Sequence, residues 1–167
     1  MPHLHAQPYD ISATGFFFET IEDYRAKASA LRNAHGDPVE EFEIQFIDGA
    51  EYDCALAAAI GLNQANLARY LECCERWEDW EKLLVIIAVG ECGYDVDPNA
   101  SPEQYEIDIY HVESMRALAE QFVEDGLIGD IPENLLIYFD YDALARELSV
   151  DYSEFEIGGE RLIYCAS

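Results

Sequence analysis

The residues that most closely match a known chemical site lie between positions 95 and 106. Asp95, Asp97, Asn99, Ser101, Glu103 and Glu106 occupy positions 1, 3, 5, 7, 9 and 12 of an EF-hand-like calcium loop. The sharp turn of such a loop needs a glycine, but Ala100 stands there. Pro98 and Pro102 interrupt the loop, and the alternating segment 105–110 predicts a strand where a helix should follow. We therefore expect a solvated acidic loop, with a calcium sensor as the alternative.

No other group of side chains has the spacing of a chemical site. His3 and His5 alternate near a terminus that we expect to be frayed, His35 closes a helix, and His111 ends a strand. None has the partners of a zinc site. Nucleophile-elbow, phosphate-loop and metalloprotease-helix motifs are missing. We expect no catalytic residue, no metal and no cofactor. A carboxylate-based hydrolase is the enzymatic alternative, and it would require a deep pocket with raised-pKa acids.

The charge of the chain is extreme for a sequence that should fold. Asp and Glu number 35 against 9 Lys and Arg, for a net charge of −26, yet half of the 167 residues are apolar and 13% are aromatic. Disordered acidic proteins lack such residues. The acidic excess is 7 charges in residues 1–71, 9 in 72–112 and 10 in 113–156. The charge is spread through the predicted helices and strands with no acidic run longer than two or three residues, which predicts an acidic surface on a folded body rather than an acidic tail.

The density of this charge is comparable to that of DNA. Duplex DNA carries one charge per about 1.7 Å, so 26 charges match roughly 44 Å of duplex. A compact chain of this length is about 40 Å across. Such self-repulsion costs stability, and simple solubility or salt adaptation is the alternative explanation. Direct binding of nucleic acid is disfavoured, because phosphate contacts need Lys and Arg.

The sequence predicts a cytoplasmic protein without a membrane segment. No signal peptide is evident, and the strongest apolar run, residues 83–89, is too short to span a bilayer. The five cysteines are an odd number with no CxxC spacing, which is typical of reduced thiols.

Two small units are predicted before residue 104. Residues 1–49 read as an α+β unit, with a strand at 16–18, a helix from the N-cap Thr20 to about Asn33, and an alternating strand at 42–47. Residues 50–103 read as a helical middle unit, with helices at 55–60, 64–74 and 77–89. In the last of these helices, the residues at core-facing spacing are Trp77, Trp80, Leu84 and Ile87.

Residues 104–167 are predicted to form an α+β unit. A strand at 105–110 is followed by a helix at 113–124, a short helical stretch from Pro132 and a helix at 141–148. Gly158-Gly159 predicts the turn of a closing hairpin. The fold class is therefore α+β, with an N-terminal sheet plus helix, a helical middle and a C-terminal sheet with helices.

Two stretches of the last third resemble a known family. Residues 127–135 (LIGDIPENL) and 138–148 (YFDYDALAREL) are similar to the C-terminal signature of the ArdA antirestriction family. Residues 118–124, the closing hairpin and residues 40–48 fit the same family. Near the start, Tyr9-Asp10 and Gly15 stand where the family has a Tyr-Asn turn with glycines and a Trp, so the first unit departs from the pattern.

The resemblance implies an elongated chain of small α/β units that forms a homodimer through its C-terminal unit. Its carboxylates would imitate the phosphates of bent B-form DNA and block type I restriction-modification enzymes, commonly on behalf of mobile genetic elements. The motif residues that we expect to shape the last unit or its dimer contact are Gly129, Ile131, Pro132, Tyr138 and Tyr141. The alternative is a general acidic protein-binding module that competes with DNA for another nucleic-acid-binding protein.

The candidate partner-binding residues are acids of the middle and last units. They are Glu72, Glu75, Glu78, Asp79, Glu120, Glu124, Asp125, Asp130, Glu133, Asp140, Asp142 and Glu147. Each of them could equally be ordinary solvated surface.

Overall fold

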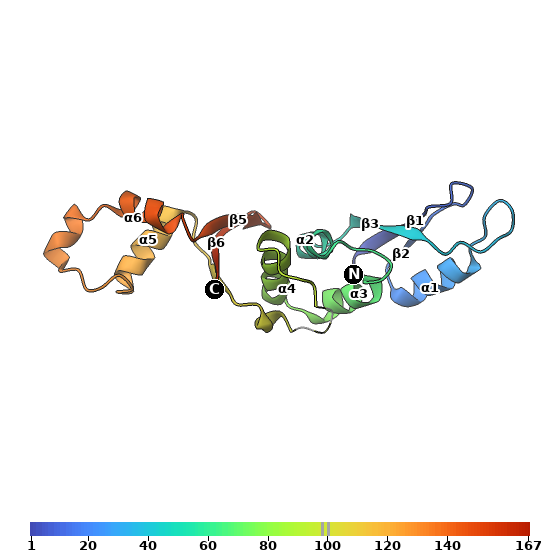
Figure 1. Cartoon of the computed structure of the whole chain (residues 1–167), viewed down its shortest axis with the longest axis horizontal. Helices are drawn as coiled ribbons and strands as arrows, with labels where there is room; N and C mark the ends of the chain where they lie inside the picture. Colours follow the sequence, from blue (N-terminus) through green and yellow to red (C-terminus); the bar gives the residue numbers. More distant parts are fainter. Residues whose placement is uncertain (98, 100) are drawn as a thin grey trace. The chain divides into compact units, whose positions relative to one another are not determined.

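The chain forms two compact units, unit 1 (Met1–Tyr105) and unit 2 (Glu106–Ser167), in a computed structural model that describes residues 1–97, 99 and 101–167 (Figure 1). Each unit contains a three-stranded antiparallel sheet with helices beside it. The prediction of a mixed α+β fold is therefore confirmed. The division into three parts stays a prediction, and Pro98 and Ala100 of the acidic loop at 95–106 lie outside the described residues.

The sheet of unit 1 has the order β2-β1-β3. Its strands are β1 (His3–Pro8), β2 (Phe16–Phe18) and β3 (Phe42–Asp48). The central strand β1 buries Leu4 and Ala6 completely, and its histidines point to the opposite face. The expectation that His3 and His5 lie in a frayed terminus is therefore wrong. The alternation of Leu4, Ala6 and Pro8 with polar residues is a strand pattern. It was not recognised because proline and histidine are not typical of strands.

One face of this sheet packs on α1 (Ile21–Ala30) through aromatic rings. Phe18 lies 5.0 Å and Phe42 6.1 Å from Tyr24, measured between ring centroids. Thr20 caps the helix as predicted, because its Oγ1 accepts a hydrogen bond of 3.2 Å from the amide of Asp23. The helix ends at Ala30, three residues before the predicted end.

The rest of unit 1 is helical, as the sequence predicts. Its elements are α2 (Glu51–Ile60), α3 (Leu67–Arg76), α4 (Asp79–Val85), the π-helical η1 (Ile86–Glu91) and the 3₁₀-helical η2 (Pro102–Gln104). The prediction that Trp80 belongs to the core is wrong, since 52% of it is exposed. Ile87 is fully buried, whereas Trp77 is half-buried beneath the guanidinium of Arg69. The helix turns Trp80 outward because Lys82 and Leu83 take the buried positions of the first turns.

A buried ion pair joins α2 to α4. Lys82 Nζ lies 2.8 Å from Asp53 Oδ1, and 8% of each side chain is exposed. Oδ1 accepts no well-directed hydrogen bond, so the attraction is mainly ionic. Tyr70 of α3 donates a hydrogen bond of 2.8 Å to the backbone carbonyl of Asp53, and burial raises the pKa of its hydroxyl far above the usual range. Burial likewise raises the pKa of the neighbouring Cys74 to about 12.

The sheet of unit 2 has the order β4-β6-β5 and contains the predicted hairpin. Its strands are β4 (Ile107–Tyr110), β5 (Ser153–Ile157) and β6 (Glu160–Ala166). Gly158 and Gly159 connect β5 to β6 with φ values of +61° and +73°. Both values lie in the left-handed region, which the type I′ hairpin turn requires and glycine adopts without strain.

The helices of unit 2 include two α-helices whose first turns are capped by a side chain. The helices of the unit are α5 (Met115–Glu124), the 3₁₀-helical η3 (Glu133–Tyr138) and α6 (Tyr141–Leu148). Ser114 caps α5 and Asp140 caps α6, each accepting from the amide three residues later. The core consists of Leu118 and Phe122 of α5 and Ile163 of β6. This small core fixes one face of α5 and leaves its other face for α6 and solvent.

Candidate protein-binding surface

The negative charge of the protein lies almost entirely on its surface. Among the residues that the structure describes, Asp53 is the only buried carboxylate. Those that are half-buried are Asp10, Asp23, Glu72 and Glu81, and every other Asp and Glu is exposed. The charges are therefore positioned to act on a partner rather than to do chemistry in a buried site.

Unit 2 has the stronger imbalance for its size. It contains 15 Asp and Glu against Arg116, Arg146 and Arg161, a net charge of −12. Arg161 lies 3.6 Å from Glu156. Arg116 bonds to Glu120 at 3.1 Å and to Asp142 at 2.8 Å, and these contacts raise the pKa of its guanidinium. Two of the predicted surface acids are thus partly neutralised.

The other predicted acids of unit 2 are exposed and lie along α5, the loop after it, η3 and α6. Those without an ion pair to any described residue are Glu124, Asp125, Asp130, Glu133, Asp140 and Glu147. Asp140 has a structural role as well, since it accepts a hydrogen bond of 2.9 Å from the amide of Ala143. The remaining five carboxylates face solvent with their charge uncompensated.

The predicted acids of unit 1 lie at the junction of α3 and α4. Glu72 is half-buried between two guanidiniums, 3.0 Å from Arg69 and 2.7 Å from Arg76, so its charge is compensated. Glu78 caps α4, and its own amide donates a hydrogen bond of 2.8 Å to Glu81. Glu75 and Asp79 are exposed. Of the four, Glu72 has the least charge to offer a partner.

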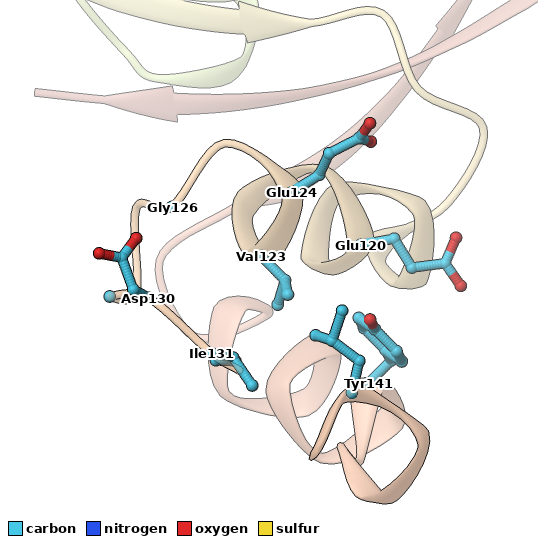
Figure 2. A pocket seen from close by; sticks show the side chains of 9 residues that line it. Glu120, Val123, Glu124, Gly126, Asp130, Ile131 and Tyr141 are labelled. Carbon is cyan, nitrogen blue, oxygen red and sulfur yellow. The ribbon is translucent and has the colours of Figure 1, made fainter. Parts of the chain in front are cut away.

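A groove lies between α5, the following loop, η3 and α6 (Figure 2). It has a volume of about 660 Å³. Its lining consists of Glu120, Val123, Glu124, Gly126, Gly129, Asp130, Ile131, Leu136 and Tyr141. Figure 2 shows Val123 pointing from α5 toward Tyr141 and Ile131, with the carboxylates of Glu120, Glu124 and Asp130 directed outward from these side chains. The groove therefore has an apolar floor and an acidic rim, and no basic residue lines it.

The turn that shapes this groove depends on Gly126. The amide of Gly126 donates to the carbonyl of Val123 and that of Leu127 to Phe122, which together make a Schellman motif at the end of α5. Gly126 has a φ of +72°, and Gly129, two residues before Ile131, has a φ of +101°. These left-handed positions return the chain over the end of α5 and place Asp130 and Ile131 on the groove wall.

The motif residues predicted to be structural divide between the groove and the surface. Ile131 and Tyr141 are half-buried and line the groove, and Pro132 is the residue immediately before η3. Tyr138 is 79% exposed. The assignment of these residues to a shaping or dimer role stays a prediction.

Around the same motif lies an exposed apolar patch that the sequence did not predict. Its members are Leu127, Ile128, Leu135, Ile137 and Tyr138, with 47–79% of each residue exposed. The segment has no helical or strand periodicity from which an apolar face could be recognised, because it consists of an apolar pair, a glycine-rich turn and a short 3₁₀ helix. The sequence feature that could have revealed the patch is the high proportion of large apolar residues in a segment too short to form its own core.

Neither metal binding nor membrane insertion finds support in the part of the chain that the structure describes. There, no three His, Cys, Asp or Glu side chains are grouped to hold an ion. No described helix combines the length and apolar character that crossing a bilayer requires.

Comparison with models of protein families gives a match over most of the chain. A family model described as "Antirestriction protein (ArdA)" matches residues 9–160. No curated protein matches the chain. The matched range covers most of both units and includes the groove lining and all twelve of the predicted surface acids.

Proposed function

The chain belongs to the ArdA family of antirestriction proteins, and on this premise we propose that it inhibits type I restriction-modification enzymes by occupying their DNA-binding groove. The exposed carboxylates would take the places of DNA phosphates among the Lys and Arg side chains of the enzyme. The protein would contribute binding alone, with no chemical step and no cofactor. It would act in the cytoplasm, where these enzymes meet incoming DNA.

The exposed, weakly compensated acids of unit 2 are the observation that best supports this mechanism. Its net charge of −12 corresponds to roughly 20 Å of duplex at about 1.7 Å per charge. A compact unit of 62 residues is about 27 Å across by the usual scaling. The unit thus approaches the charge density of DNA. Unlike a DNA duplex, it does not have to be bent at a cost in free energy when it binds the enzyme.

The mechanism predicts inhibition that weakens with salt. Purified chain is titrated into a type I enzyme, and cleavage and methylation of a plasmid with its recognition sites are measured at 0.05 and 0.2 M salt. We expect half-inhibition near equimolar protein at low salt and at least about tenfold weaker inhibition at 0.2 M, because screening reduces both encounter rate and affinity. Polyglutamate of equal net charge is the control, and it should inhibit far less. Full activity at a large molar excess of the chain would contradict the proposal.

We further propose that the exposed apolar patch, defined above as Leu127, Ile128, Leu135, Ile137 and Tyr138, joins two copies of the chain. Its five large apolar side chains are all exposed and lie within one segment, residues 127–138, and exposed apolar residues that gather in this way often mark a protein–protein contact. The family resemblance implies a homodimer joined through this unit. Contact through apolar side chains would also keep the acids of both copies available to the enzyme.

The dimer proposal predicts that the Ile137→Asp/Tyr138→Ser variant is monomeric. Both side chains are 79% exposed, so their replacement costs little in folding but removes apolar area from the contact. We expect the dissociation constant from sedimentation equilibrium to rise by about a hundredfold. Val150→Asp, at a 78% exposed residue of the same unit outside the patch, is the matched control and should remain dimeric. An unchanged dimer in the double variant would refute this contact.

A further inference from the structure

We infer that the groove of unit 2 receives a single basic side chain, an arginine or a lysine, from the inhibited enzyme. The aliphatic stem would pack on the apolar floor, and the charged head would reach the carboxylates of the rim. The inference rests on the proposed function, because it specifies how one cation of the DNA-binding groove is held. This contact differs from imitation of a phosphate, because a DNA phosphate offers a basic side chain negative charge but no apolar surface for its stem.

The first argument is the pairing of floor and rim. Val123, Ile131, Leu136 and Tyr141 supply apolar contact, whereas Glu124 and Asp130 supply charge at the margin. Long basic side chains have this same division, with an apolar stem and a charged end. A purely apolar ligand would leave the carboxylates of the rim without an opposite charge, and an anion would be repelled by them. The occupant that satisfies both parts of the groove is a basic side chain.

At one end of the groove, Arg116 of the chain itself makes the kind of contact that we infer for the incoming side chain. Its guanidinium carbon lies 6.0 Å from the ring centroid of Tyr141, while Nε bonds to Glu120 and Nη1 to Asp142. An aromatic face and two carboxylates thus already hold one guanidinium here. Because Glu120 is committed to Arg116, an incoming cation would be directed to the other carboxylates of the rim.

Glu124 and Asp130 are the carboxylates that remain for such a cation. Both are exposed, and neither makes an ion pair with any described residue. In Figure 2, Asp130 lies on the loop after Gly126, and the Glu124 side chain leaves α5 on the side opposite to Val123. The left-handed Gly126 brings Asp130 close to the end of α5, since a Cβ built on Gly126 would lie 3.7 Å from the Asp130 carboxylate. The rim therefore presents two uncompensated charges from two different segments.

The charge of unit 2 argues against a second copy of the chain as the occupant. A net charge of −12 on each copy would bring acidic surfaces together over a groove whose own rim is acidic. The lining of the groove includes Leu136 but none of the five residues of the apolar patch, although Leu135 and Ile137 are its neighbours in the chain. The groove can thus remain open when the patch is covered.

A direct binding measurement tests the inference on the full chain without any enzyme. The probe is N-acetylarginine N-methylamide, and its neutral isostere N-acetylcitrulline N-methylamide is the control. Methyl NMR signals of Val123, Ile131 and Leu136 are followed during titration. We expect the arginine probe to shift these three signals and the citrulline probe to leave them unchanged. Shifts that are equal for both probes, or that avoid these methyl groups, would overturn the inference.

Two charge-matched variants complete the test. Glu124→Gln/Asp130→Asn removes the rim charges, and Asp151→Asn/Glu154→Gln removes two exposed, unpaired charges of the same unit outside the groove lining. We expect the rim variant to lose the probe shifts and to inhibit a type I enzyme about tenfold less well, and the control variant to change less than threefold. If the wild-type chain does not inhibit, the proposed function fails. If it inhibits and both variants inhibit equally, the groove inference fails.

Concentrating the chain without any probe identifies a competing occupant. A second copy in the groove would shift the same three methyl signals as protein concentration rises. That outcome would overturn the assignment to a basic side chain of the enzyme. Unchanged signals over the concentration range in which sedimentation detects the dimer would support it.

Discussion

Neutralising the five uncompensated acids of unit 2 should weaken inhibition of a type I enzyme by about a hundredfold at 0.15 M salt. The substitutions are Glu124→Gln, Asp125→Asn, Asp130→Asn, Glu133→Gln and Glu147→Gln. Each removes a charge from a residue that is exposed and has no ion pair with any described residue. A rim contact between opposite charges contributes about 0.5 kcal/mol, and five such contacts amount to roughly a hundredfold in affinity.

The change should not act through folding. The variant loses self-repulsion, so its thermal midpoint should be equal to or above that of the wild type. A matched variant has the same net charge as this one but neutralises five acids outside the predicted set. These are Glu106, Asp108, Glu113, Asp151 and Glu154, all of which are exposed. We expect less than tenfold loss in this control. Equal losses in the two variants would mean that net charge alone matters and that the predicted acids have no special position.

Replacing Lys82 by methionine should cost about 3–5 kcal/mol of unfolding free energy, the largest effect on stability that we expect from one substitution. The change leaves the Asp53 carboxylate buried without its cation, at a site where 8% of the side chain is exposed. Chemical denaturation followed by circular dichroism measures the loss. In a chain of net charge −26 that already repels itself, this loss could unfold unit 1 altogether.

A second variant separates the charge effect from lost packing. Asp53→Leu/Lys82→Met removes both partners, so no buried charge remains, and it should recover most of the stability that Lys82→Met loses. Lys27→Met is the surface control, because Lys27 pairs with Asp23 at 2.7 Å but both side chains are more than 40% exposed. Its cost should be within about 1 kcal/mol. If Lys82→Met unfolds at the same denaturant concentration as the wild type, the ion pair has no structural importance.

The elements that were predictable are those determined by local sequence. The alternation of Phe42, Ile44 and Phe46 identified β3, Thr20 identified the start of α1, and Gly158-Gly159 identified the last hairpin. In each case the information lies within a few residues, because side-chain period, capping oxygen and left-handed φ are local requirements. β1 escaped prediction because its two histidines and terminal proline outweigh the alternation of Leu4 and Ala6.

The features that were not predictable depend on distant residues. Asp53 and Lys82 are 29 positions apart, and among 35 acids no local pattern identifies the one that is buried. The groove joins Val123 of α5 to Ile131 and Tyr141 through two left-handed glycines, so its floor exists only after the chain has turned. The sequence could identify the acids and the motif. Their division into rim, apolar floor and exposed patch required the fold.

If the chain and DNA compete for one site on the enzyme, the chain must displace bound DNA. A fluorescent duplex with the recognition sequence is bound to the methyltransferase core of a type I enzyme, and its anisotropy is measured while the chain is added. The account predicts complete displacement, with an apparent Kd for DNA that rises linearly with chain concentration. Persistence of the DNA complex at saturating chain, or a ternary complex of enzyme, DNA and chain, would contradict it.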